Sequence, residues 1–100
     1  MTTSVQEIDG KLVATLFGEL DTAATPEAEL ALQPLLQSQG KDIVIDCTDL
    51  EYIASSGLRL LLSILKQAQS VGSRVVLKHV NEVVRDVLDL TGFVSIFEFE

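Results

Sequence analysis

Two adjacent serines and a glycine stand where a buried strand is predicted to give way to a helix. They are Ser55, Ser56 and Gly57, preceded by Ala54 and followed by Leu58. A serine at a helix start can accept a hydrogen bond from a free backbone N–H, a cap that stabilises by about 1 kcal/mol. With Ser56 as this cap, Ser55 would lie just outside the helix and Gly57 would keep its flank open. Ser55 is then an unmodified helix-start residue, a phosphate acceptor or a nucleophile.

A catalytic serine does not fit the residues around it. A nucleophilic serine needs an activating base, and the only histidine, His79, is predicted at the end of a different strand. The sequence also has no G-x-S-x-G segment, which would place a serine on a sharp turn. We therefore expect no enzyme and no catalytic residues, and we expect His79 to be a surface or strand-end residue.

Three acidic residues, Asp46, Asp49 and Glu51, follow a predicted strand and raise the question of a metal site. Hard cations need several oxygen ligands at defined loop spacing, with a glycine at the sharp turn. These residues lack that arrangement, so we expect a solvated acidic loop, no metal site and no cofactor. Asp21 has two open interpretations, a contact to a partner or a turn residue that hydrogen-bonds its own backbone.

Hydrophobic periodicity predicts the elements that must position these residues. The pair Asp9-Gly10 is typical of a tight turn, so a hairpin is predicted over residues 5–17, with its second arm covered on both faces. A helix follows, which we expect Thr25 to cap, with Pro26 at its first position. Pro34 is expected to break this helix, because proline lacks a backbone N–H.

The strongest helical pattern starts at Ser55 or Ser56. Leucines recur at helical spacing from Leu58, and a polar stripe runs from Arg59 to Ser70. The other predicted elements are strands at 43–45, 74–77 and 93–99, the first of them buried on both faces, and a helix capped by Asn81. Helices that alternate with strands after a hairpin indicate an α/β fold. We expect one domain over residues 1–100, with a mixed, mostly parallel sheet of about five strands and three helices.

The composition limits the classes of partner and the compartment. Fifteen acidic residues against seven basic ones give a net charge of −8. This charge repels nucleic acids and anionic lipids, so we expect neither as a partner, whereas a protein with a basic or mixed surface is compatible. The single cysteine, Cys47, sits in an apolar run and is expected to be an inert core thiol. With no predicted transmembrane stretch and no signal-peptide pattern, we expect a cytoplasmic protein.

The segment Ala54-Ser55-Ser56-Gly57-Leu58 resembles the D-S-S-G-L run that opens the second helix of STAS domains. The segment Gly18-Glu19-Leu20-Asp21 resembles the G-E-L-D segment that follows the hairpin of the same family. The chain is thus similar to the anti-sigma factor antagonists within this family. It departs from the family pattern at Ala54, where aspartate is usual.

The resemblance implies a regulatory function based on partner switching. The first serine of the S-S-G run is phosphorylated in this branch, which identifies Ser55 as the expected phosphosite. The implied partners are an anti-sigma factor that is also a serine kinase with a histidine-kinase-like ATPase fold, and a serine phosphatase. The implied partner-binding residues are Asp21, Ala54, Ser55, Ser56, Gly57 and Arg59.

Two other function classes stay open at this point. One is a non-phosphorylated STAS scaffold or an accessory subunit of an ABC-type lipid transporter, which Ala54 favours. The other is an enzyme or small-ligand binder, for which no acid–base group or cofactor motif is visible. The oligomeric state is not predicted by any feature of the sequence.

Overall fold

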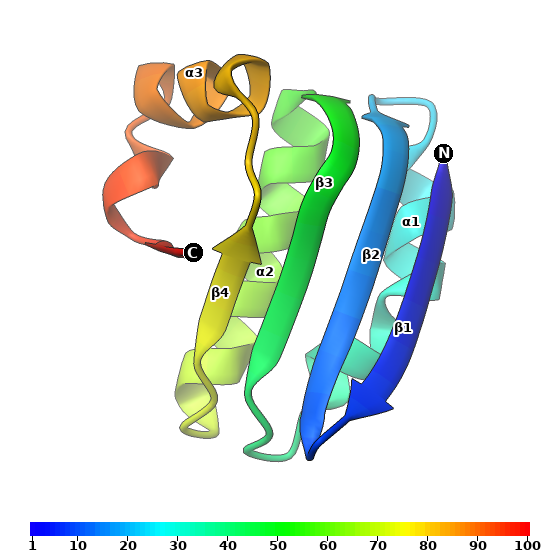
Figure 1. Cartoon of the computed structure of the whole chain (residues 1–100), viewed down its shortest axis with the longest axis vertical. Helices are drawn as coiled ribbons and strands as arrows, with labels where there is room; N and C mark the ends of the chain where they lie inside the picture. The colour runs from blue at the N-terminus through cyan, green and yellow to red at the C-terminus, as the bar shows by residue number, and fades with distance from the viewer.

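Five strands form one mixed sheet whose order in space, β1-β2-β3-β4-β5, is also their order in the chain. The computed structural model describes all residues from 1 to 100. The strands are β1 (Thr2–Ile8), β2 (Lys11–Leu20), β3 (Ile43–Ile53), β4 (Val75–Lys78) and β5 (Glu98–Phe99). Strand β1 pairs antiparallel with β2, and all other neighbours are parallel. The predicted α/β fold with an antiparallel edge strand is therefore confirmed (Figure 1).

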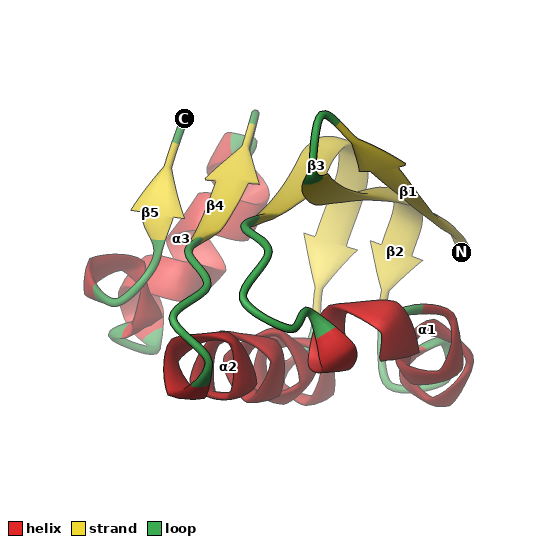
Figure 2. Cartoon of the chain, turned by 90° about the horizontal axis from the view of Figure 1, so that it is seen from below, coloured by secondary structure: helices red, strands yellow, loops and turns green.

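The helices lie between the strands as the alternating pattern predicted. They are α1 (Thr25–Ala31), α2 (Ser55–Ser70) and α3 (Glu82–Leu90), with 3-10 turns η1 (Gln33–Gln37) and η2 (Phe93–Ser95). Helices α1 and α2 lie side by side against one face of the sheet (Figure 2), and α3 packs against β3. No helix in the structure combines the length and the apolar character that crossing a bilayer requires.

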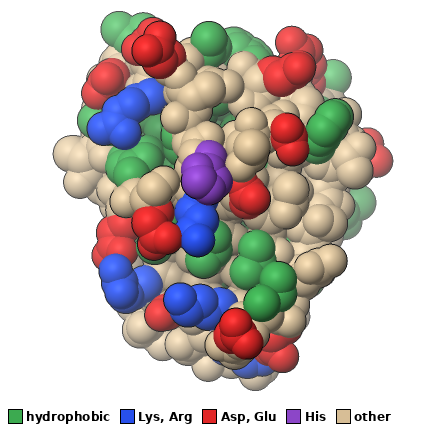
Figure 3. Space-filling model, in the orientation of Figure 1, with side chains coloured by type: hydrophobic (Ala, Val, Ile, Leu, Met, Phe, Trp, Pro, Cys, Tyr) green, Lys and Arg blue, Asp and Glu red, His purple; other side chains and the backbone are tan.

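All the parallel connections place their helices so that one face of the sheet is left open. We expected residues 12–17 and 43–45 to be covered on both faces, and this prediction is wrong. Alternate side chains of β2 and β3 are buried, whereas Val13 and Val44 are half-buried and Phe17 is 57% exposed. The reason is the topology of the sheet. Each parallel strand is added on the same side of the one before it, and crossover connections have the same handedness. Every crossover helix therefore lies on the same face of the sheet. Figure 3 shows the open face, where apolar and charged side chains are mixed.

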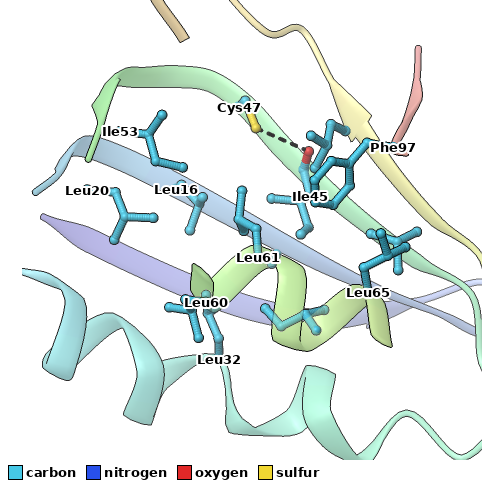
Figure 4. Packing of buried hydrophobic residues seen from close by; sticks show 14 of the residues in the cluster. Leu16, Leu20, Leu32, Ile45, Cys47, Ile53, Leu60, Leu61, Leu65 and Phe97 are labelled. Atoms are coloured by element: carbon cyan, nitrogen blue, oxygen red, sulfur yellow. Dashed lines mark hydrogen bonds between the residues drawn. The ribbon is translucent and has the colours of Figure 1, made fainter. Parts of the chain in front are cut away.

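The core lies between the covered face of the sheet and the helices, and α2 supplies its largest share (Figure 4). Leu61 and Leu65 are buried as predicted, Leu62 is half-buried, and Leu60 completes the buried face. Cys47 is 1% exposed, and burial, with the nearby Asp46 charge, raises the pKa of its thiol to about 12. The burial confirms the prediction of a core thiol. A buried thiol with a raised pKa forms little of the reactive thiolate.

The turns and the chain end show where local patterns succeed and fail. Asp9 and Gly10 both have positive φ, as the predicted two-residue hairpin turn requires. Pro34 lies in η1, just after α1 ends, so the predicted break is confirmed. The predicted strand at 93–99 is wrong for most of its length, because residues 93–95 form η2 and only Glu98–Phe99 pair with β4.

Candidate functional site

The two motifs singled out in the sequence meet at the carboxyl end of β2 and β3. Leu20 pairs with Ile53 in the parallel register, and the N–H of Ala54 donates to the carbonyl of Leu20 at 2.9 Å. The last residues of Gly18-Glu19-Leu20-Asp21 therefore lie beside the first residues of α2. Gly18 has a φ of 104° next to a register shift, a conformation that glycine adopts without strain.

The acidic residues before α2 belong to β3 and not to a loop. Strand β3 continues to Ile53, so the prediction of a solvated acidic loop is wrong. The Asp46 carboxylate accepts hydrogen bonds from the Thr48 hydroxyl at 2.5 Å and from its N–H at 3.0 Å. These bonds hold the pKa of Asp46 below its usual value. No group of three or more His, Cys, Asp or Glu side chains is arranged to hold a metal ion.

Helix α2 starts without a side-chain cap. The N-cap position is Ala54, whose methyl group cannot accept a hydrogen bond. The prediction of Ser56 as cap, with Ser55 outside the helix, is therefore wrong. Ser55 is the first helical residue, it is exposed, and its hydroxyl has no hydrogen-bond partner within the chain.

Ser56 differs from its neighbour because its hydroxyl is held by α1. Its Oγ lies 3.0 Å from Thr25 Oγ1, and Thr25 Oγ1 in turn donates to the Asp21 carbonyl at 2.7 Å. A hydroxyl carries one proton, so Ser56 must donate to Thr25. Ser55 thus keeps a free hydroxyl, whereas the hydroxyl of Ser56 is engaged.

Asp21 closes the turn that leads into α1. Its Oδ1 accepts a hydrogen bond from the N–H of Ala24 at 2.8 Å, and its carbonyl accepts from the N–H of Thr25 at 3.1 Å. The prediction that Thr25 caps α1 is wrong. The cap position is Ala24, and the N–H of Ala24 is bonded to the Asp21 side chain. The turn role of Asp21 is therefore observed, and its half-buried carboxylate stays at the edge of the site. Sequence reasoning missed Thr25 as a site residue.

Gly57 is buried and sets how closely α2 approaches the sheet. A Cβ at this position would lie 2.7 Å from Leu20 Cγ and 2.9 Å from Ile53 Cγ1. Both distances are shorter than van der Waals contact, so any side chain would push the helix start outward. Gly57 therefore does not keep an open flank, as we had expected, but fits α2 against the ends of β2 and β3.

Arg59 lies one turn after Ser55 and is exposed. It takes part in none of the three ion pairs of the structure, which join Lys41 to Glu7, Arg74 to Glu98 and Lys78 to Glu100. Residues four apart in a helix share a face, so the guanidinium and the Ser55 hydroxyl are presented together. The exposed part of the site thus combines a free hydroxyl with an unpaired cation.

The surface beside Asp21 is acidic. A shallow hollow of about 450 Å³ is lined by four carboxylates, those of Glu19, Asp21, Glu27 and Glu51. His79 lies elsewhere, in a hollow on the open face of the sheet with Val13 and Val44. The only histidine of the chain is therefore not part of the site at the start of α2.

Comparisons with known proteins agree with this geometry. The family model of the STAS domain matches residues 2–100. BtrV of Bordetella bronchiseptica, a proposed anti-sigma factor antagonist, is 35% identical over 97 residues, which cover 97% of this chain and 84% of BtrV.

Solved structures show the same architecture. A proposed anti-sigma factor antagonist from Thermotoga maritima superposes with a TM-score of 0.85 at 25% identity, over 97% of this chain and 84% of that one. The phosphorylated form of the Bacillus cell fate determinant SpoIIAA superposes with a TM-score of 0.74 at 22% identity, over 99% of this chain and 91% of that one. The second likeness shows the fold alone.

Proposed function

Since this chain belongs to the STAS domain family, we propose that it is an anti-sigma factor antagonist whose partner binding is switched off by phosphorylation of Ser55. The observation that carries the proposal is the exposed, unbonded Ser55 hydroxyl at the start of α2. The name of BtrV supports the antagonist function. SpoIIAA, which has the same fold, has itself been solved in a phosphorylated form.

The physical basis of the switch is charge at a surface that a partner covers. A phosphate on Ser55 adds about −1.5 to −2 charges at pH 7. The uncapped α2 N-terminus favours an anion by about 0.3–1 kcal/mol, so the fold should tolerate the modification. Burial of this charge under a partner without a matched cation costs several kcal/mol. A loss of about 3 kcal/mol weakens binding by more than a hundredfold.

The proposed partners are an anti-sigma factor serine kinase of the histidine-kinase-like ATPase fold and a serine phosphatase, acting in the cytoplasm. The acidic hollow favours lysine and arginine on the part of the partner that faces it, because complementary charge speeds association and selects the partner. The part of the partner that covers Ser55, which does not line this hollow, is proposed to offer no cation matched to a phosphate. Partner contacts are proposed for Asp21, Ala54, Ser55, Ser56 and Arg59, with Gly57 acting through helix placement. The protein itself catalyses no reaction in this scheme.

One observation favours a second function. Ala54 removes the carboxylate that the family usually places beside the acceptor serine. A STAS scaffold that is not phosphorylated, or an accessory subunit of an ABC-type lipid transporter, would not need that carboxylate. The two functions differ in whether Ser55 is modified and in which partner is captured.

The deciding experiment combines phosphorylation and binding. The chain is incubated with ATP and the anti-sigma factor from the same genome, and the phosphorylated residue is located by mass spectrometry. Binding is then measured by calorimetry for the unmodified, phosphorylated, Ser55→Asp, Ser55→Ala and Ser56→Ala proteins. We expect a loss of more than about a hundredfold on phosphorylation and a smaller loss for Ser55→Asp. Each alanine variant loses at most one hydroxyl contact to the partner, so both should bind far more tightly than the phosphorylated protein.

Two results would overturn the proposal. One is an affinity for the anti-sigma factor that is the same with and without phosphate on Ser55. The other is the absence of any binding to the anti-sigma factor, together with capture of an ABC ATPase from a lysate, which would favour the accessory-subunit function.

A further inference from the structure

The two adjacent serines at the start of α2 are chemically alike, yet the structure treats them differently. Resting on the proposed function, we propose that Thr25 is a positioning residue that directs phosphorylation to Ser55 by holding the hydroxyl of Ser56. Thr25 lies 31 positions before Ser56 in the chain, on the first turn of α1. Its hydroxyl is the only group bonded to that of Ser56.

The direction of the hydrogen bonds carries the inference. Thr25 Oγ1 donates its single proton to the Asp21 carbonyl at 2.7 Å, so it can only accept from Ser56, at 3.0 Å. Two lone pairs allow it to accept while it donates. The chain from Ser56 through Thr25 to Asp21 therefore runs in one direction and fixes the Ser56 side chain toward α1.

The reaction requires a hydroxyl that can turn toward the kinase. The serine Oγ forms a bond to the γ-phosphorus of ATP, the bond from that phosphorus to the β,γ-bridging oxygen breaks, and ADP leaves. The hydroxyl proton passes to a base of the kinase. Ser55 Oγ is exposed and unbonded, so it can meet these requirements without breaking a contact in the chain.

Ser56 meets the same requirements only after it releases Thr25. Thr25 cannot serve as the base, because it is a neutral alcohol whose own proton is already donated to Asp21. Rotation of Ser56 outward also leaves the half-buried Thr25 oxygen without its donor. One net hydrogen bond corresponds to roughly a fivefold preference, which adds to whatever preference the kinase itself has.

Partial burial of Ser56 offers a rival explanation for the same selectivity. The two explanations separate in matched variants at position 25. Thr25→Val keeps the shape and burial but removes the hydroxyl, whereas Thr25→Ser keeps the hydroxyl. Only the hydrogen-bond explanation predicts that these two variants differ.

The test uses the kinase with ATP and tandem mass spectrometry that distinguishes phosphate on Ser55 from phosphate on Ser56. The wild type, Thr25→Val and Thr25→Ser are compared, each also in the Ser55→Ala background, and thermal melting confirms folding. We expect the ratio of Ser56 to Ser55 phosphate to rise about fivefold or more in Thr25→Val and to stay at the wild-type value in Thr25→Ser. In the Ser55→Ala background, Thr25→Val should raise Ser56 phosphorylation by a similar factor.

The outcomes separate this inference from the proposed function. If the wild type receives phosphate on Ser55 and Thr25→Val leaves the ratio unchanged, the role of Thr25 is overturned and the proposed function stands. If neither serine of the wild type is modified, the proposed function fails and the inference fails with it. Should Thr25→Val melt below the assay temperature, Thr25→Ala with the same readout replaces it.

Discussion

Helices α2 and α3 start in nearly the same backbone conformation but with opposite side-chain chemistry. The N-cap residue of α2 is Ala54, with φ −91° and ψ 171°, and that of α3 is Asn81, with φ −77° and ψ 171°. Asn81 Oδ1 accepts from the N–H of Val84 at 2.8 Å, and its Nδ2 donates to the Leu50 carbonyl at 2.8 Å. Ala54 makes no side-chain hydrogen bond.

This difference separates a helix start that is fixed by a side-chain cap from one that has none. Asn81 ties α3 to β3 and satisfies a free backbone N–H, so its side chain is fully used. At α2, no side chain covers the first N–H groups, and the Ser55 hydroxyl beside them is unbonded. A phosphate can therefore be accommodated at α2 without displacing a cap.

The largest effect on stability is expected from removal of the Asn81 side chain. Asn81→Ala removes the cap of α3 and also removes the hydrogen bond that the side-chain amide donates to the Leu50 carbonyl. We expect a loss of about 2 kcal/mol in the free energy of unfolding, from one cap and one hydrogen bond. Urea denaturation measures it. Asn81→Asp keeps the oxygen that caps α3 but not the amide donor, so it should lose less stability than Asn81→Ala. A loss below about 0.5 kcal/mol for Asn81→Ala would show that the two helix starts contribute equally to stability.

A smaller effect of opposite sign is expected from transfer of a cap to α2. Ala54→Asn and Ala54→Asp place an acceptor where the backbone already has the conformation of a capping residue. We expect a gain of about 1 kcal/mol in the free energy of unfolding, measured in urea. Ala54→Asp should gain less than Ala54→Asn if the carboxylates of the acidic hollow repel the new charge. If neither variant gains stability, the first backbone N–H groups of α2 already have other hydrogen-bond partners.

Features set by neighbours in the chain could be predicted from the sequence. The cap at Asn81 and the hairpin at Asp9-Gly10 depend on residues within three positions, and both are confirmed. The buried face of α2 follows helical periodicity and is largely confirmed as well. The predicted cap at Thr25 was wrong, because Asp21, four residues earlier, accepts the hydrogen bond from the N–H of Ala24.

Features set by distant parts of the chain could not be predicted in this way. The bond between Thr25 and Ser56 joins residues that only the packing of α1 on α2 brings together. The open face of the sheet was missed because valine favours strands whether or not both faces are covered, as Val13 and Val44 show. The close fit of Gly57 against Leu20 likewise depends on how β2 ends. The helical pattern nevertheless predicted a start at Ser55 or Ser56, and α2 starts at Ser55.

The smallest expected effect is the most informative about the two serines. Ser55→Ala removes a hydroxyl without a partner and should change the free energy of unfolding by less than about 0.5 kcal/mol. Ser56→Ala removes the donor to Thr25 and should lose about 1 kcal/mol. Urea denaturation of both variants under one condition gives the comparison. Equal losses would assign Ser55 a structural role, and the contrast between a free α2 start and a capped α3 start would no longer point to Ser55 as the phosphate acceptor.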